Sequence, residues 1–167
     1  ISNVSLDQFK TYDTAGDLSS NQFRYSMLHR GREEDILPYA AQHDIATLTY
    51  WSLEAGLLTG KINRERIFEE SDFRYNANQW HPWYKEENIE RLLQVFAKWF
   101  DLLDSHECTL SELVIAWTAA QPGATHVLCG AKTAAQAKQN ARAGSMVLRT
   151  SEIERIRDDL EILGDPI

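Results

Sequence analysis

The run Ile45-Ala-Thr-Leu-Thr-Tyr50 is compact, apolar and rich in β-branched residues, and it decides the fold class of this chain. Such a run is typical of a buried strand in a parallel sheet. An amphipathic helical pattern over residues 33–43 precedes it, and a longer one over residues 86–106 follows. Because strands separated by helices of this length form parallel β/α units with right-handed crossovers, the sequence predicts an α/β fold.

Two further extended stretches, residues 18–23 and 125–129, lie in a similar setting, and the second is another candidate for a buried strand. Residues 51–85 form a long irregular segment, of a kind that is usually functional or disordered, and its aromatic residues favour order. The triplet Gln121-Pro-Gly predicts the end of a helix. Four residues with capping potential mark helix starts: Ser5, Thr109, Thr133 and Ser151.

The composition excludes several classes of protein. The chain has 167 residues, 43% of them hydrophobic and 25% charged, which is typical of one folded unit. Seventeen basic against 25 acidic residues give a net charge of −8, which argues against binding to nucleic acid or to a membrane surface. No apolar run is long enough to span a membrane. Two cysteines in unrelated contexts predict neither a disulfide nor a metal site, so we expect a cytoplasmic protein.

The first residues, Ile1-Ser-Asn3, carry no initiator methionine, and a helical pattern begins almost at once. Only about three strands are recognisable, fewer than a closed barrel of eight β/α units requires. We therefore expect the chain to be part of a larger α/β barrel. Such barrels carry function on the loops after their strands, and these loops begin here at Ser2, Gln22, Tyr50 and Gly130.

The loop Cys129-Gly-Ala-Lys-Thr-Ala-Ala-Gln136 is the first candidate site. Gly130 permits close approach of a ligand, the helix that begins after Thr133 favours an anion at its N-terminus, and Lys132 adds a positive charge. Gln136 and Asn140 share one helix face. The residues alone are equally consistent with a simple glycine turn capped by Thr133, with Lys132 in solvent.

The segment from Tyr50 to Lys61 is the second candidate site. Aromatic side chains at a strand end can stack on a flat ring, and glycines with Lys61 can wrap a pyrophosphate. The residues alone favour a plainer interpretation, in which Tyr50 and Trp51 pack in the core and Lys61 is a surface charge.

Together these segments resemble the C-terminal half of an aldo-keto reductase. Tyr50-(x)5-Gly-Leu-Leu-Thr-Gly-Lys61 is similar to the loop after the seventh barrel strand of that family, and Gly130-Ala-Lys-Thr-(x)2-Gln-(x)3-Asn140 resembles its adenosine-phosphate loop after the eighth. Ser2-Asn3 matches the end of the fifth strand, and Asn21-Gln22-(x)2-Tyr25 the end of the sixth. The resemblance implies that residues 1–167 are one segment, the C-terminal half of a (β/α)8 TIM barrel with its helices outside.

The resemblance also implies an NADP(H)-dependent oxidoreductase that reduces aldehydes or ketones by hydride transfer, with this chain supplying the dinucleotide site. The resemblance implies that Ser2, Asn3 and Gln22 contact the nicotinamide carboxamide and that Tyr50 stacks on the ring. The pyrophosphate would be contacted by Trp51, Ser52, Leu53 and Lys61, and the adenosine half by Arg74. The 2′-phosphate would lie beside Gly130 at Lys132 and Gln136, and the adenine at Gln139 and Asn140. A cation and an amide at the 2′-phosphate favour NADP(H) over NAD(H). Glu54 departs from the pattern, because its carboxylate should weaken binding of a pyrophosphate unless it points away.

The resemblance places the family's catalytic Asp, Tyr, Lys and His upstream of the position that Ser2 matches. We therefore expect no catalytic residue in this chain, little activity from it alone, and the missing N-terminal half-barrel as its partner toward a small carbonyl substrate. His81 is expected to be a pocket-wall or surface residue. No spacing of residues indicates a metal site. The alternative is a truncated, non-catalytic half-barrel that binds a dinucleotide or self-associates through its open sheet edges.

Overall fold

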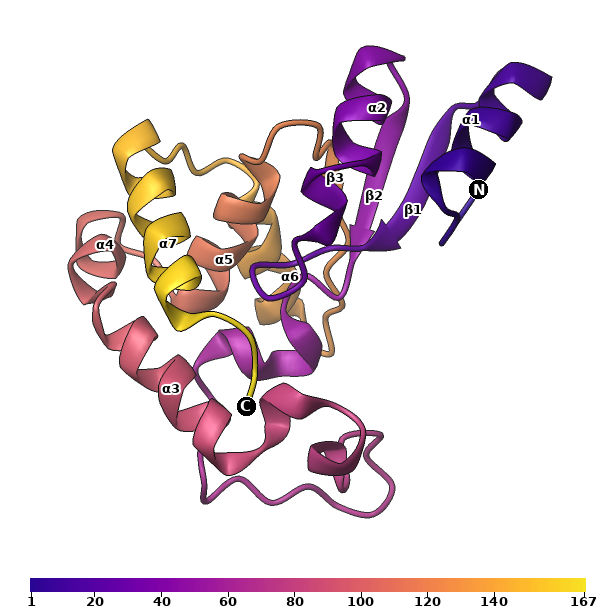
Figure 1. Cartoon of the computed structure of the whole chain (residues 1–167). Coiled ribbons are helices and arrows are strands. Elements are labelled where there is room, and N and C mark those ends of the chain that lie inside the picture. The colour runs from indigo at the N-terminus through magenta and orange to yellow at the C-terminus, as the bar shows by residue number, and fades with distance from the viewer.

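A three-stranded parallel sheet organises the structure, a computed structural model that describes residues 1–167 (Figure 1). Its strands are β1 (Ser20–Arg24), β2 (Ala46–Tyr50) and β3 (His126–Val127), in the order β1-β2-β3. Both strand pairings are parallel, so all three strands end at the same edge of the sheet. The predicted α/β class and the parallel β/α arrangement are confirmed.

The N-terminal residues extend the sheet beyond β1. Ser2 forms an isolated parallel bridge with Gln22. The Gln22 N–H donates to the carbonyl of Ile1 at 3.0 Å, and the Asn3 N–H donates to the carbonyl of Gln22 at 2.8 Å. These bonds place Asn3 beside β1, close to the edge where the strands end.

Two helices pack beside β1 and β2, namely α1 (Leu6–Ala15) and α2 (Ile36–Gln42) (Figure 1). The capping box of Ser5 with Gln8 confirms the predicted start of α1. The prediction that α2 begins near residue 33 is wrong, because the side chain of Asp35 accepts from the Ile36 N–H and starts the helix there. Seven buried residues form the core of this unit: Phe9, Phe23, Tyr25, Ile36, Leu37, Ala40 and Ile45.

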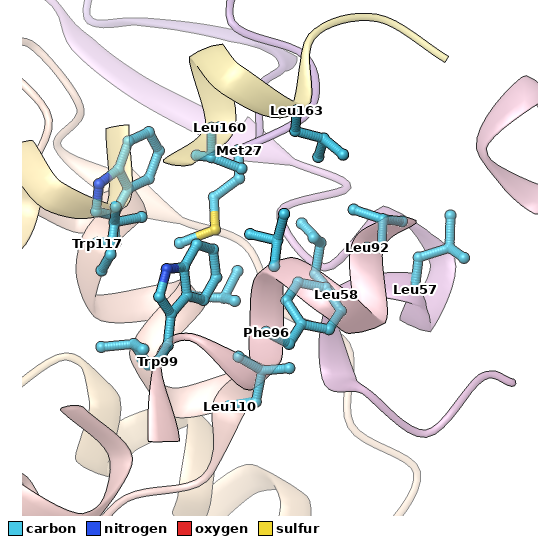
Figure 2. Packing of buried hydrophobic residues seen from close by; sticks show 14 of the residues in the cluster. Met27, Leu57, Leu58, Leu92, Phe96, Trp99, Leu110, Trp117, Leu160 and Leu163 are labelled. Carbon is cyan, nitrogen blue, oxygen red and sulfur yellow. The ribbon is translucent and has the colours of Figure 1, made fainter. Parts of the chain in front are cut away.

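The remaining helices gather on the other side of the molecule around a larger core of 22 buried residues (Figure 1). Figure 2 shows Trp99 and Trp117 in this core, with Met27 inserted beside them from the segment after β1. Thr109 forms the predicted capping box with Glu112. The helices are α3 (Glu86–Ala97), α4 (Phe100–Ser105), α5 (Leu110–Ala119), α6 (Ala134–Ala143) and α7 (Thr150–Leu163).

The predicted single helix over residues 86–106 is wrong, because it breaks into α3 and α4 at Lys98 and Trp99. Trp99 turns fully into the core, and its indole N–H donates to Asp159 of α7 at 2.9 Å. Phe100, the first residue of α4, is left 67% exposed. A contact with a distant helix therefore overrides the local helical pattern.

The predicted buried strand over residues 125–129 is reduced to two residues, and that prediction is wrong in both length and burial. β3 covers only His126 and Val127, with His126 exposed. It has a strand neighbour on one side only, and Leu128 is left 39% exposed. The outer side of such an edge strand has backbone N–H and C=O groups without strand partners.

The turn that leads into β3 confirms the predicted stop at Gln121-Pro-Gly. Gly123 has φ +82°, and a Cβ built there lies 2.5 Å from the carbonyl oxygen of Leu37. The Gly123 carbonyl accepts from the Thr47 hydroxyl at 2.7 Å, which ties this turn to β2. A glycine is required at this position both for its conformation and for the close approach of α2.

The long segment 51–85 contains neither an α-helix nor a strand. It is ordered through three 3-10 helices, at Glu54–Thr59, Ala77–Gln79 and Pro82–Tyr84. Nowhere does the chain form a helix with the length and apolar character that crossing a membrane requires.

Candidate functional site

Four residues singled out in the sequence meet at the edge where the strands end. Ser2 and Asn3 flank Gln22 through the parallel bridge described above. The hydroxyl of Tyr50, the last residue of β2, donates to Oδ1 of Asn3 at 2.9 Å. The structure thus joins the Tyr50 ring to the side-chain amide of Asn3, 47 residues away in the chain, beside the backbone of Gln22.

The turn that follows Tyr50 is conformationally strained. Trp51, Glu54 and Ala55 have φ values of 61°, 45° and 54°, in the left-handed region that non-glycine residues rarely adopt. Such a conformation costs of order 1–3 kcal/mol at each residue and persists only where neighbouring contacts hold it. Residues 51–56, which we call the strained turn, therefore need support from outside the turn.

Part of this support is a buried carboxylate. Glu54 is fully buried, and its Oε1 accepts from the Ser26 hydroxyl at 2.5 Å. Its Oε2 accepts from Nη2 of Arg24 at 2.5 Å and from Nε2 of His81 at 3.0 Å. Burial by itself raises the pKa of Glu54, but the hydrogen bonds from His81, Arg24 and Ser26 outweigh burial and lower it. Glu54 thus points into the protein, away from any phosphate at the surface.

We call Arg24, Ser26, Glu54 and His81 the Glu54 cluster. His81, expected to be a pocket-wall or surface residue, is 4% exposed, which excludes the surface position. Nδ1 of His81 and Nε of Arg24 are buried without a hydrogen-bond partner. The cluster joins the end of β1, the strained turn and the distal part of segment 51–85 through one carboxylate.

An aromatic rim surrounds Trp51 next to this cluster. The guanidinium carbon of Arg24 lies 4.6 Å from the centroid of the Trp51 ring. The His81 ring is parallel to that of Trp51, at 5.9 Å and an interplanar angle of 5°. The rings of Trp80 and Phe73, 47% and 63% exposed, lie 6.2 and 6.5 Å from Trp51. Trp51 is therefore at the surface of the site and is not the core residue that its sequence context favoured.

The loop after β3 is closed by its own polar side chains. The Lys132 N–H donates to Oε1 of Gln136 at 2.6 Å, and Thr133 caps α6 by accepting from the Gln136 N–H at 3.2 Å. Nδ2 of Asn140 donates to the Gly130 carbonyl at 3.3 Å. These bonds confirm the capped glycine turn, and they leave the exposed ammonium group of Lys132 free to face a ligand.

A cavity of about 590 Å³ lies between Lys132 and the long segment. Its lining residues are Arg66, Ile67, Phe68, Glu69, Ser71, Asp72, Phe73 and Lys132. Phe73 of this lining also belongs to the aromatic rim, since its ring centroid lies 6.5 Å from that of Trp51. The loop after β3 and the turn after β2 are thereby connected along one surface.

Arg74 is held inside this surface. Its Nε and Nη2 donate to Asp72 at 2.9 and 2.6 Å, and its Nη1 donates to the carbonyl of Ala55 in the strained turn at 3.3 Å. The hydrogen bonds from Arg74 lower the pKa of Asp72, and the charge of Lys132 adds to this effect. Arg74 thus braces the strained turn from the long segment.

The remaining singled-out residues divide into inner and outer positions. The Ser52 side chain is buried, with its hydroxyl 3.5 Å from that of Thr49, and Leu53 packs against the larger core. The Ser52 side chain therefore does not reach the surface, and that of Leu53 is partly buried. Lys61 is exposed after the left-handed Gly60, and Gln139 is half-buried on α6.

Comparison with known proteins decides the family. The model of the "Aldo/keto reductase family" matches residues 1–161. The chain belongs to the aldo/keto reductase family. It is 30% identical over 161 residues to the NADH-specific methylglyoxal reductase of Escherichia coli, covering 96% of this chain and 48% of that protein. It is also 30% identical over 169 residues to the aldo-keto reductase YhdN of Bacillus subtilis, covering 100% of this chain and 50% of that protein.

A solved structure supports the fold. The glycerol dehydrogenase AKR11B4 of Gluconobacter oxydans superposes with a TM-score of 0.84 at 28% identity, over 99% of this chain and 49% of that chain. This chain thus spans about half the length of the aldo/keto reductases that it matches. Its three-stranded parallel sheet with surrounding helices agrees with part of a TIM barrel.

The aldo/keto reductases are oxidoreductases that use nicotinamide dinucleotides, and the residues at this edge fit such a group. Among the carboxylates near the phosphate path that the resemblance implies, Glu54 and Asp72 are each bonded to an arginine, whereas Glu69, which lines the cavity with Lys132, makes no salt bridge. Glu54 and Asp72 are therefore neutralised by their partners, and the Lys61 and Lys132 ammonium groups are exposed. No group of three or more His, Cys, Asp or Glu side chains converges as a metal site would require.

The sequence reasoning missed the Glu54 cluster. Glu54 stands out as a carboxylate in an otherwise apolar, glycine-rich motif, and this was the one local signal. Its partners Arg24 and His81 are 30 and 27 residues away in the chain. No pattern of spacing links them, so only the folded chain shows that they belong together.

Proposed function

We propose that residues 1–167 form the dinucleotide-binding, C-terminal half of a (β/α)8 barrel in an NADP(H)-dependent reductase of aldehydes or ketones. The observation that carries this proposal is the hydrogen bond from Tyr50 to Asn3 beside Gln22, where the strands end. It holds an aromatic ring next to two amides, which suits a flat ring that bears a carboxamide.

In this proposal the chain's own residues bind and orient the cofactor. Tyr50, whose hydroxyl is held by Asn3, stacks on the nicotinamide, and the side chains of Ser2, Asn3 and Gln22 bind its carboxamide. The strained turn and Lys61 follow the pyrophosphate. When bound, the cofactor supplies a hydride to the carbonyl carbon of the substrate. The family resemblance assigns the proton-donating tyrosine to the half of the barrel that this chain does not span.

The adenosine end is proposed to lie on the loop after β3. Lys132 and Gln136 bind the 2′-phosphate beside Gly130, Gln139 and Asn140 face the adenine, and Arg74 supports the adenosine side from the long segment. The free charge of Lys132 favours NADPH, since a second phosphate needs a cationic partner. The Escherichia coli relative is named as NADH-specific, so the choice of cofactor has to be measured on this protein.

Calorimetric titration of the chain with NADPH and with NADH tests the proposal. We expect binding of both, with NADPH the tighter, and reduction of an aldehyde only when the other half of the barrel is present. Failure of both cofactors to bind the folded chain would remove the proposal.

A second candidate is a non-catalytic half-barrel that self-associates. The exposed Leu128 and the open edge at β3 favour it, because an unpaired strand edge is a template for another chain. Light scattering after gel filtration separates the two functions. A stable dimer without dinucleotide binding supports self-association, and a dinucleotide-binding monomer supports the reductase half.

We also propose a cytoplasmic location. Cys108 and Cys129 are free and half-buried, which suits a reducing compartment. Burial raises the pKa of the Cys129 thiol to about 11 and that of Cys108 above its ordinary value, so both stay protonated at neutral pH.

A further inference from the structure

We infer that Glu54 is a positioning residue. It holds Trp51 and the strained turn in the conformation that binds the cofactor, already in the cofactor-free protein. This inference rests on the proposed function for its effect on binding. The placement of Trp51 by Glu54 stands on geometry alone. No part of the sequence pattern assigned this role, since the carboxylate was expected either to weaken binding of a pyrophosphate or to point away from it.

Glu54 connects three segments of the chain. Its carboxylate accepts from Arg24 at the end of β1, from Ser26 just after that strand, and from His81 in the distal part of segment 51–85. Glu54 itself lies in the strained turn at φ 45°. With the carboxylate removed, nothing else in the cluster bonds these three segments to one another except a 3.3 Å contact between Arg24 and His81.

The position of the Trp51 side chain depends on the partners of Glu54. Two of the groups that flank its indole are partners of Glu54, namely the Arg24 guanidinium at 4.6 Å and the parallel His81 ring at 5.9 Å. Trp51 also has positive φ, so its side-chain direction depends on the turn being held. Fixing Arg24 and His81 on one carboxylate therefore fixes the indole next to Tyr50.

The negative charge of Glu54 is compensated inside the protein. Glu54 has no exposed surface, and its negative charge is matched by the Arg24 guanidinium at 2.5 Å. A buried carboxylate without such partners would be strongly unfavourable, so the three donors must be in place whenever the turn is closed. The cluster thus holds the turn in place, and its carboxylate does not compete with a phosphate for Lys61.

The test uses Glu54→Gln, which keeps the shape of the side chain and removes its charge. The matched control is Glu112→Gln in α5, because Glu112 is also buried and bonded to an arginine, Arg142 at 2.6 Å, but lies outside the strained turn and the Glu54 cluster. The first readout is the near-ultraviolet circular dichroism and tryptophan emission of each variant, in the native and in the Trp51→Phe background. The second readout is the dissociation constant for NADPH.

We expect Glu54→Gln to change the Trp51-dependent part of the spectrum and to weaken NADPH binding at least tenfold. The spectral change should vanish in the Trp51→Phe background. Glu112→Gln should leave both readouts unchanged within twofold, even if it lowers the melting temperature. A folded Glu54→Gln protein with the native tryptophan spectrum overturns the inference. If the native chain binds no dinucleotide, the proposed function fails, whereas the spectra still decide the positioning role.

Discussion

Replacing Lys132 by alanine is the sharpest test of which dinucleotide this protein prefers. Lys132 lines the cavity beside the loop after β3, and the two polar groups that close this loop, Gln136 and Asn140, bond to backbone and not to its ammonium group. The ammonium charge is thus available to a 2′-phosphate. NADPH carries this phosphate and NADH lacks it, so the substitution should affect only one of the two ligands.

The magnitude follows from the exposure of the side chain. A hydrogen bond to a charged group contributes about 1.5–3 kcal/mol. Lys132 is exposed, and solvent screening places the expected loss near the lower end, at about 1.5 kcal/mol, or roughly tenfold in the dissociation constant. Because the interaction is between exposed charges, the loss should shrink as ionic strength rises from 0.05 to 0.5 M, in line with a Debye length that falls below about 5 Å.

The assay is calorimetric titration of the native chain, Lys132→Ala and Lys138→Ala with NADPH and NADH. Lys138 is an exposed lysine of α6 and controls for the loss of one positive charge. We expect Lys132→Ala to weaken NADPH about tenfold while NADH stays within twofold, and Lys138→Ala to change neither. Equal weakening of both cofactors, or no change in NADPH binding, would refute the assignment of Lys132 to the 2′-phosphate.

Three further outcomes are expected. Tyr50→Phe removes the 2.9 Å bond to Asn3, which at about 0.5–1.5 kcal/mol should weaken binding of both cofactors by roughly two- to tenfold in the same titration, and unchanged affinity would show that this bond does not orient the ring. Gly123→Ala places a Cβ 2.5 Å from the Leu37 carbonyl oxygen at φ +82°, and it should lower the free energy of unfolding, measured in urea, by more than about 1 kcal/mol. Gly130→Ala, whose Cβ would have no atom within 4 Å, should not lower it. Equal stability of the two variants would contradict the close packing of Gly123 against Leu37. The hydrogen bonds from Arg142 and Arg149 outweigh burial and hold the pKa values of Glu112 and Glu152 at about 2, below their values in the unfolded chain. The stability that these carboxylates contribute is therefore present above about pH 4.5 and is lost as the pH falls toward 2. Urea titrations at pH 7 and pH 3 should show this loss. In Glu112→Gln this loss should be smaller, and an identical loss would assign the acid sensitivity to other groups.

Several features of this protein are determined by the sequence itself, because the interactions that make them are local. The capping boxes at Ser5 and Thr109 bond side chains to backbone three residues away, and the stop at Gln121-Pro-Gly depends on the backbone of those residues. The β-rich run that becomes β2 carries its preference in its side chains. The likeness of ordered motifs to one family is equally a property of the chain as written, and the match over residues 1–161 confirms it.

Other features follow only from the tertiary structure, because they depend on partners far away in the chain. The break between α3 and α4 lies where Trp99 bonds to Asp159, and the length of β3 is set by its pairing with β2 at two positions. Whether the carboxylate of Glu54 faces solvent or the interior is set by Arg24 and His81, each more than 25 residues away. The cost of burying a charge depends on its surroundings in space, and no local pattern contains them.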